Sequence, residues 1–170
     1  MKRISARYRS RKSPLEVVPH VDLERYLGKW YEIATIPQRF QKGCVGVTAD
    51  YVLRKNGDIE VVNTCREGTL DGRVRTARGK ARVVDKATNA KLKVSFFWPF
   101  WGAYWIIGLD AEYRWAVVGH PSRDYLWILS RSPQMDQATY DDILRLIAEK
   151  GYDLTRIKKT LQPAIDVDTP

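Results

Sequence analysis

Gly28-Lys29-Trp30-Tyr31-Glu32-Ile33-Ala34 is the stretch that decides the fold, because a short helical turn leads there directly into a β-type run. Asp22 can cap that turn at its start, and Gly28 can end it. Further β-type runs follow at intervals of roughly twelve residues, a spacing typical of sandwiches and barrels. The last is Tyr125-Leu126-Trp127-Ile128-Leu129-Ser130, which Arg131 follows. The order predicts an all-β, closed antiparallel barrel.

The pattern and the turn signals place the strands along the chain. Asn56-Gly57 is the clearest hairpin signal, because this pair tolerates the positive φ angles of a tight turn. Asp136 and Gly151 bound an amphipathic segment, so we expect a helix packed outside the barrel, followed by a short strand at about 156–161. Strands are expected at about 30–36, 45–54, 58–65, 74–84, 90–97, 103–109, 113–119 and 125–131.

Length and charge indicate one globular domain with a basic start. The chain has 170 residues and a formal net charge of +9. Six of these charges lie within the first thirteen residues, which contain no acid, so the charge of the remainder is ordinary. We interpret residues 1–20 as a basic, disordered tail, residues 21–162 as barrel and helix, and residues 163–170 as a C-terminal tail. A charge confined to the tail predicts no specific nucleic-acid partner.

The chain carries no recognisable export signal. Its basic start is not followed by the apolar region of a signal peptide, and no run is long enough for a membrane helix. Neither cysteine lies in a plausible lipidation context. The expectation is therefore an intracellular protein or one whose leader is missing from this chain.

The same residues resemble the lipocalin family over about 22–162. The resemblance rests on Gly28-x-Trp30 with Tyr31-Glu32-Ile33-Ala34, on the Asp110 turn and on Leu129-Ser130-Arg131. Lys91-Leu92-Lys93-Val94-Ser95-Phe96-Phe97 and 124–131 are closest to the bacterial branch, which is also similar to apolipoprotein D and to plant temperature-induced lipocalins. The resemblance implies an eight-stranded up-and-down barrel with one closed and one open end.

In the family, the tryptophan of Gly-x-Trp plugs the closed end, and an arginine before the helix packs across the indole. Carried over, these roles fall to Trp30, after Gly28, and to Arg131. Such a cation–π contact contributes roughly 1–2 kcal/mol when partly desolvated. The three residues are therefore expected to be structural.

The alternation of each strand then predicts which side chains line the interior. The predicted lining is large and mostly apolar, which suits an acyl chain beside a polar head group. The alternative is that these side chains fill the barrel completely. The predicted ligand-binding residues are Ala49, Tyr51, Val61, Asn63, Leu92, Val94, Phe96, Tyr104, Ile106, Tyr125 and Trp127.

These features predict a non-enzymatic carrier without cofactor or metal, which binds a fatty acid or lysophospholipid, with a role in membrane maintenance. The resemblance implies the periplasmic side of an outer membrane, with the cytoplasm as the alternative. The other candidate function is a lipocalin-fold enzyme acting through Cys44 or Cys65, but His20 and His120 have no evident partner for such chemistry. The cations Arg39, Lys42 and Arg123 on mouth loops either attract a phosphate or carboxylate or are simply solvated.

An unusual aromatic run begins at Phe96 and includes Trp98, Phe100 and Trp101. Aromatic side chains favour burial or an interface, so three interpretations stay open. The residues fold over the mouth as a lid, insert into a membrane surface or form the contact of a homodimer.

Cys44 and Cys65 both fall at the mouth end of adjacent strands. A simple two-residue turn at Asn56-Gly57 would put Cys65 opposite Thr48, which is too far from Cys44 for a disulfide. A bulge, or a bend in the loop before the strand, would close that gap. The cysteines are therefore either a disulfide or two free thiols.

Overall fold

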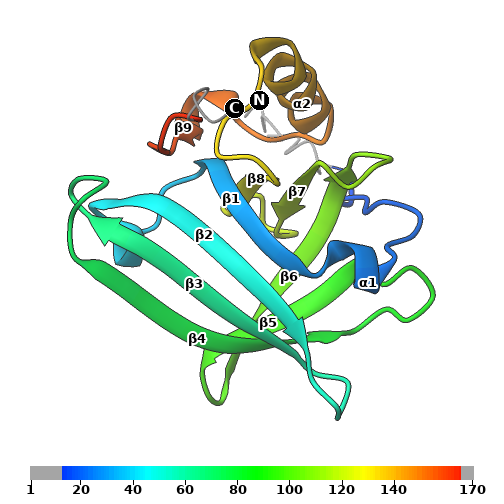
Figure 1. Cartoon of the computed structure of the whole chain (residues 1–170). Helices are drawn as coiled ribbons and strands as arrows, with labels where there is room; N and C mark the ends of the chain where they lie inside the picture. The colour runs from blue at the N-terminus through cyan, green and yellow to red at the C-terminus, as the bar shows by residue number, and fades with distance from the viewer. Residues whose placement is uncertain (1–12, 166–170) are drawn as a thin grey trace, which may run out of the picture.

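The computed structural model describes residues 13–165 and shows a closed antiparallel barrel with a helix outside it (Figure 1). The sheet order is β2-β3-β4-β5-β6-β7-β8-β1-β9, and β1 also pairs with β2 to close the barrel. The predicted eight-stranded barrel is therefore confirmed. Its strands are β1 (Gly28–Thr35), β2 (Cys44–Leu53), β3 (Ile59–Glu67), β4 (Val74–Val83), β5 (Lys91–Phe97), β6 (Phe100–Leu109), β7 (Trp115–Gly119) and β8 (Leu126–Ser130).

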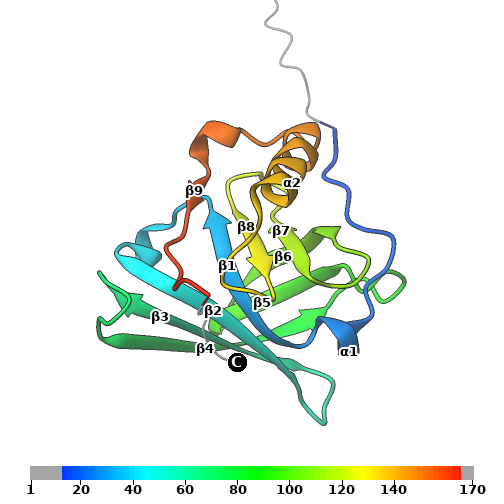
Figure 2. The ribbon, with the colours of Figure 1, turned by 45° about the horizontal axis from the view of Figure 1, so that its top comes forward.

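The closing strand β1 is shared between two neighbours. Its first half pairs with β2, from Gly28 opposite Tyr51 to Tyr31 opposite Thr48. Its second half continues along β8 and meets β9 (Lys158–Lys159) on its other side. Gln162 fills the place where β1 and β2 separate, because its Nε2 donates to the carbonyl oxygens of both strands at 2.8 Å. In Figure 2 the C-terminal segment runs beside the barrel wall at this point.

The predicted helix is α2 (Gln137–Glu149), which packs against the outer face of the barrel. Asp136 caps its start by accepting from the backbone N–H of Thr139. Gly151 follows its end with φ +87°, a conformation that a side chain would disfavour. Tyr140, Ile143 and Ile147 are buried, and they share an apolar cluster with outward residues of β7 and β8. This cluster is separate from the one inside the barrel.

The segment before α1 (Leu23–Tyr26) differs from the expected loose tail. Leu15 is buried, and the backbone N–H of Val18 donates to Ile106 O at 3.0 Å. Residues 13–20 therefore lie against the barrel, because this part of the predicted tail is apolar enough to pack on it. The carbonyl of Pro163, in the expected C-terminal tail, likewise accepts from Gln134 Nε2 at 2.9 Å. The basic residues 2–12 lie outside the described residues.

Candidate ligand-binding site

The closed end of the barrel is built around Trp30, whose side chain is fully buried. The guanidinium carbon of Arg131 lies 3.7 Å from the centroid of the indole. The same guanidinium donates to the carbonyl oxygens of Lys29 at 2.9 Å and Arg25 at 2.7 Å. Arg131 therefore ties α1 and β1 together across the barrel end. The pair predicted from the sequence is formed, with Gly28 beside Arg131 Nη1.

Three tyrosines form a hydrogen-bonded floor above Trp30. The hydroxyl of Tyr104 lies 2.7 Å from that of Tyr26 and 2.8 Å from that of Tyr51. Burial raises the pKa of all three phenols, to about 12 for Tyr51, so each keeps its proton at neutral pH. Sequence alternation predicted Tyr51 and Tyr104. It missed Tyr26, which comes from the short helix α1 rather than from a strand.

Above and around this floor, the lower half of the barrel is filled with side chains. Several predicted lining residues are buried there in one apolar cluster with Trp30 and Leu129. They support the floor and leave little surface for a ligand to contact. These residues are Ala49, Tyr51, Val61, Leu92 and Ile106.

The upper half of the barrel is open. Gly102 lies on the inward row of β6 opposite Val94, it is exposed, and a Cβ built on it would meet nothing within 4 Å. Ala77, on the inward row of β4 opposite Asn63, is also exposed. The other inward residues at this level are partly buried, and they are Asn63, Val94, Phe96, Tyr104 and Trp127. The barrel is thus a cup with a filled base. Gly102 and Ala77 were missed because small residues give no apolar signal.

Tyr125 lies at the edge of the barrel, and its predicted place in the lining stays a prediction. β8 begins only at Leu126, so Tyr125 belongs to the preceding loop, where alternation no longer fixes the direction of a side chain. It is 36% exposed; its ring stacks on that of Trp127 at a centroid distance of 6.3 Å and lies tilted against that of His120 at 5.2 Å. Tyr125 therefore contributes to the rim of the cup.

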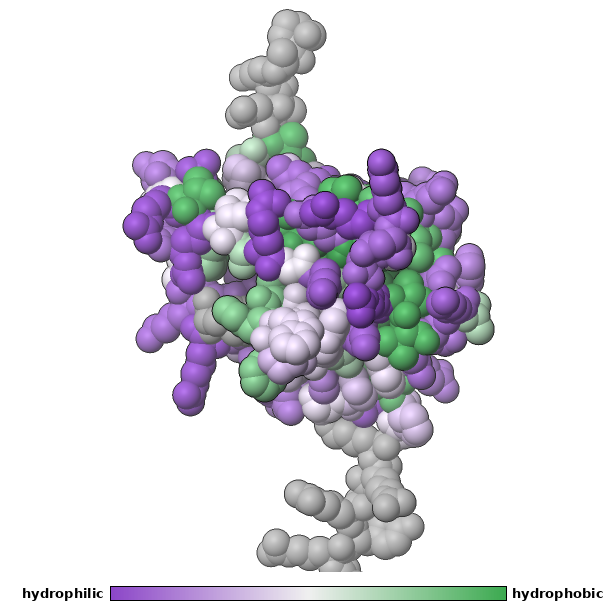
Figure 3. All heavy atoms as spheres, turned by 90° about the horizontal axis from the view of Figure 1, so that it is seen from below, coloured by the Kyte–Doolittle hydropathy of each residue, from purple (hydrophilic) through white to green (hydrophobic). Residues whose placement is uncertain are grey.

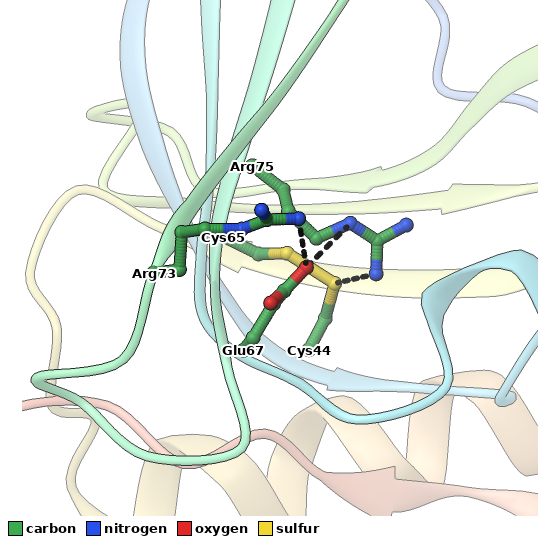
Figure 4. Close-up of a disulfide and its surroundings, with 5 residues drawn as sticks. All are labelled: Cys44, Cys65, Glu67, Arg73 and Arg75. Carbon is green, nitrogen blue, oxygen red and sulfur yellow. Dashed lines mark hydrogen bonds and ion pairs between the residues drawn. A yellow bond between two sulfur atoms is a disulfide. The ribbon is translucent and has the colours of Figure 1, made fainter.

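At the mouth, Cys44 and Cys65 form a disulfide with a Cα–Cα distance of 5.5 Å (Figure 4). Thr48 pairs with Thr64, one residue away from the register of a simple two-residue turn. A register shift between Val45 and Thr48 then brings Cys44 within reach, and Gly46 adopts φ +59° there. The bulge considered from the sequence is therefore the feature that permits the bond.

The aromatic loop between β5 and β6 projects into solvent. Phe97, Trp98 and Phe100 are 80%, 78% and 75% exposed, which does not fit a lid packed over the mouth. Trp101 lies on the outer face instead, with Lys93 Nζ 4.7 Å and Arg82 Cζ 5.4 Å from its ring centroid. Figure 3 views the molecule from the side of the β2–β3 and β5–β6 turns, where apolar patches lie among hydrophilic side chains.

Glu32 is a buried carboxyl on the inward row of β1, two residues above Trp30. Burial raises its pKa from 4.5 to about 7, against the lowering effect of hydrogen bonds with Thr160 and Thr35. Its Oε1 has no hydrogen-bond partner among residues 13–165. A neutral, protonated Glu32 fits this environment better than a carboxylate does.

The described residues offer little to the enzymatic alternative. Both cysteines are consumed by the disulfide, so neither supplies a thiolate nucleophile. His120 Nδ1 lies 2.8 Å from Ser122 Oγ in a local turn at the rim. Within residues 13–165 there is no group of three or more His, Cys, Asp or Glu arranged for a metal ion. The same residues contain no helix long and apolar enough to cross a bilayer.

A closed eight-stranded barrel, plugged by a Trp–Arg pair and open at the other end, defines a ligand-binding cup of the lipocalin type. The lipocalin-like domain model matches residues 21–162, and this chain belongs to the lipocalin family. Proteins of this family bind small hydrophobic ligands.

Relatives come from plants, bacteria and animals. Temperature-induced lipocalin-1 of Arabidopsis thaliana is 42% identical over 168 residues, covering 94% of this chain and 87% of that protein. Outer membrane lipoprotein Blc of Escherichia coli K12 is 44% identical over 147 residues, covering 86% and 82%. Apolipoprotein D of Mus musculus is 35% identical over 156 residues, covering 86% and 79%. The predicted resemblance to these branches is confirmed.

Solved structures show the same fold at lower identity. Insecticyanin from the tobacco hornworm Manduca sexta superposes with a TM-score of 0.69 at 19% identity, covering 90% of this chain and 87% of that one. Apocrustacyanin C2 gives a TM-score of 0.67 at 19% identity, with 84% and 81% covered.

Proposed function

We propose that this lipocalin is a non-enzymatic carrier that holds one single-chain lipid, a fatty acid or a lysophospholipid, in the upper half of its barrel. The observation that carries the proposal is the open, exposed position of Gly102 on the inward row of β6, opposite Val94 and two residues from Tyr104. An acyl chain fits a passage with apolar walls and a small residue on one side.

The energetics favour such a ligand. Burial of an acyl chain contributes about 0.8 kcal/mol per CH₂. Fourteen buried carbons would thus contribute roughly 11 kcal/mol, before association and ordering costs of several kcal/mol. Micromolar binding needs about 8 kcal/mol, so it requires most of this gain to survive those costs.

We further propose that the carrier works at a membrane surface, where the aromatic tip makes contact. Phe97, Trp98 and Phe100 form the tip, and Lys80, Arg82 and Lys93 surround the neighbouring Trp101 on the outer face. Aromatic rings favour the interfacial zone of a bilayer, and cations favour anionic head groups. The disulfide fits an oxidising compartment such as a periplasm. The name of the bacterial relative, outer membrane lipoprotein, points to the same place.

A fluorescent fatty acid titrated into delipidated protein tests the cavity. Saturable uptake of one probe per chain is expected. Gly102→Phe, which puts a ring into the open space, should abolish uptake. The matched control is Ala103→Phe, because Ala103 pairs with the outward Lys93 and places the same ring outside the barrel. Equal uptake by both variants, or none by the unmodified protein, would overturn the proposal.

A further inference from the structure

We propose that the mouth of the cup recognises an anionic head group, a carboxylate or a phosphate, through Arg75, with the amide of Asn63 below it as a second polar contact. The inference rests on the proposed lipid-binding function and adds to it the charge of the ligand and its orientation. Arg75 shares the carboxylate of Glu67 with Arg73, and the side chain of Asn63 makes no hydrogen bond within residues 13–165. Arg75 was not among the cations expected at the mouth.

The strand register places Arg75 on the inner row of β4. Arg75 pairs with Cys65, Ala77 with Asn63 and Gly79 with Val61, and Cys65 and Val61 are buried members of the inward row of β3. The two inward residues below Arg75 are therefore alanine and glycine. Ala77 is exposed and leaves room directly below Arg75, whereas the ring of Phe96 packs over Gly79 and bounds this space from below.

The charge around Arg75 is not balanced. One carboxylate oxygen, Glu67 Oε1, lies 3.3 Å from Arg73 Nη2 and 3.7 Å from Arg75 Nε (Figure 4). Two guanidinium groups thus share one carboxylate, which leaves the cluster with a net charge of +1. The side chains of these two arginines are 81% and 44% exposed, so Arg75 is the more enclosed of the two.

Arg75 also keeps donors for a further acceptor. Its Nη1 lies 3.8 Å from Cys44 Sγ, and sulfur is a weak acceptor. A guanidinium has five N–H donors in a planar fork that matches carboxylate and phosphate oxygens. Cys65 pairs with Arg75 across β3 and β4, and its disulfide to Cys44 ties β3 to β2, so the strand next to the guanidinium is covalently anchored.

Asn63 lies one step deeper on the neighbouring strand. Two residues along a strand span about 7 Å, so its amide lies below the guanidinium at the depth of a head group's ester or carbonyl. The side chain is partly buried and makes no hydrogen bond within residues 13–165 that would occupy it. The arrangement orients the ligand with its charged head at the rim and its chain toward Tyr104.

Comparing the affinities of two ligands with equal chain length but different head-group charge distinguishes recognition of the charge from burial of the chain. Myristate is anionic, whereas tetradecanol is neutral, and each can be measured by displacement of a neutral fluorescent lipid. In the unmodified protein both should bind. Arg75→Gln should weaken myristate about three- to tenfold, the range of a partly exposed ion pair, and leave tetradecanol within twofold. Arg73→Gln is the matched control, since it removes a cation from the same Glu67 but leaves the inner row intact.

A second measurement needs no variant. Raising the ionic strength should weaken myristate binding to the unmodified protein and leave tetradecanol binding unchanged, because salt screens an accessible charge pair. In Arg75→Gln, this difference between the two ligands should disappear. If both ligands bind and Arg75→Gln affects them equally, or if Arg73→Gln has the larger effect, the assignment of Arg75 is wrong. If neither ligand binds the unmodified protein, the proposed function itself fails.

Discussion

Arg131 lies over the indole of Trp30, with its guanidinium carbon 3.7 Å from the ring centroid, while its nitrogens donate to the carbonyl oxygens of Arg25 and Lys29. The contact joins residues about a hundred positions apart and closes one end of the barrel. It makes that end a structural plug, so ligand access is left to the opposite end.

The first prediction concerns this plug. Arg131→Met should lower the free energy of unfolding by about 3 kcal/mol, because it removes the cation–π contact and several hydrogen bonds to backbone carbonyls. Arg131→Lys should recover part of the lost stability, since lysine keeps the positive charge but lacks the several N–H donors of the guanidinium. Urea unfolding measures both, with exposed Arg145→Met on α2 as the control. A loss below about 1 kcal/mol for Arg131→Met would contradict the account.

The second prediction concerns the disulfide at the rim. The bond closes a loop between residues 21 positions apart. Replacing Cys44 with Ser and Cys65 with Ala together should cost about 3 kcal/mol, chiefly through the greater freedom of the unfolded chain. Reductant should lower the urea midpoint of the unmodified protein and leave that of the double variant unchanged. Equal sensitivity of the two proteins to reductant would rule the bond out.

The third prediction concerns Glu32 and pH. Its pKa is raised from 4.5 to about 7 in the folded chain, so the carboxyl is neutral in both states below pH 4.5. Between pH 4.5 and 7 only the unfolded chain ionises readily, and stability therefore falls as the pH rises, by at most about 3 kcal/mol, and levels off above pH 7.

Glu32→Gln has no proton to lose and should remove this part of the pH dependence. The measurement is the urea midpoint of both proteins from pH 4 to pH 8, with exposed Glu24→Gln as the control. If Glu32→Gln leaves the pH profile unchanged, burial does not perturb Glu32 as described.

A part of the fold or of the site could be predicted from the sequence only where its residues belong to a motif or to a periodic pattern. Trp30, Arg131 and the strand order were predictable because a short motif and the period-two alternation encode them. Asn63, Val94 and Tyr104 followed from the same alternation. For Tyr125 the alternation carries less weight, because this residue comes just before the strand begins.

Other parts of the site depend on long-range geometry. Gly102 and Ala77 open the cup because they lack side chains, and an absent side chain leaves no hydrophobic pattern. Arg75 looked like one more surface cation of a basic strand, and only its register opposite Cys65 places it on the inner row. The packing of residues 13–20 depends on β6, a strand far along the chain.

The fourth prediction concerns the aromatic tip. Replacing Trp98 and Phe100 with Ser should abolish sedimentation with anionic liposomes, since it removes the exposed rings that favour the interface. Binding should also fall with added salt, owing to the cations around Trp101. Lipid uptake in solution should remain intact, because neither residue lines the cup. Unchanged liposome binding, or a dimer in solution that the variant dissociates, would assign the tip to another partner.

Native mass spectrometry of the intact protein tests the central claim most directly. Spectra are recorded as purified, after delipidation and after addition of a single-chain lipid, and any released small molecule is identified after denaturation. The account predicts one lipid per chain, lost on delipidation and restored on addition. A chain that purifies empty and stays empty with excess lipid would show that side chains fill the barrel, and the carrier function would be wrong.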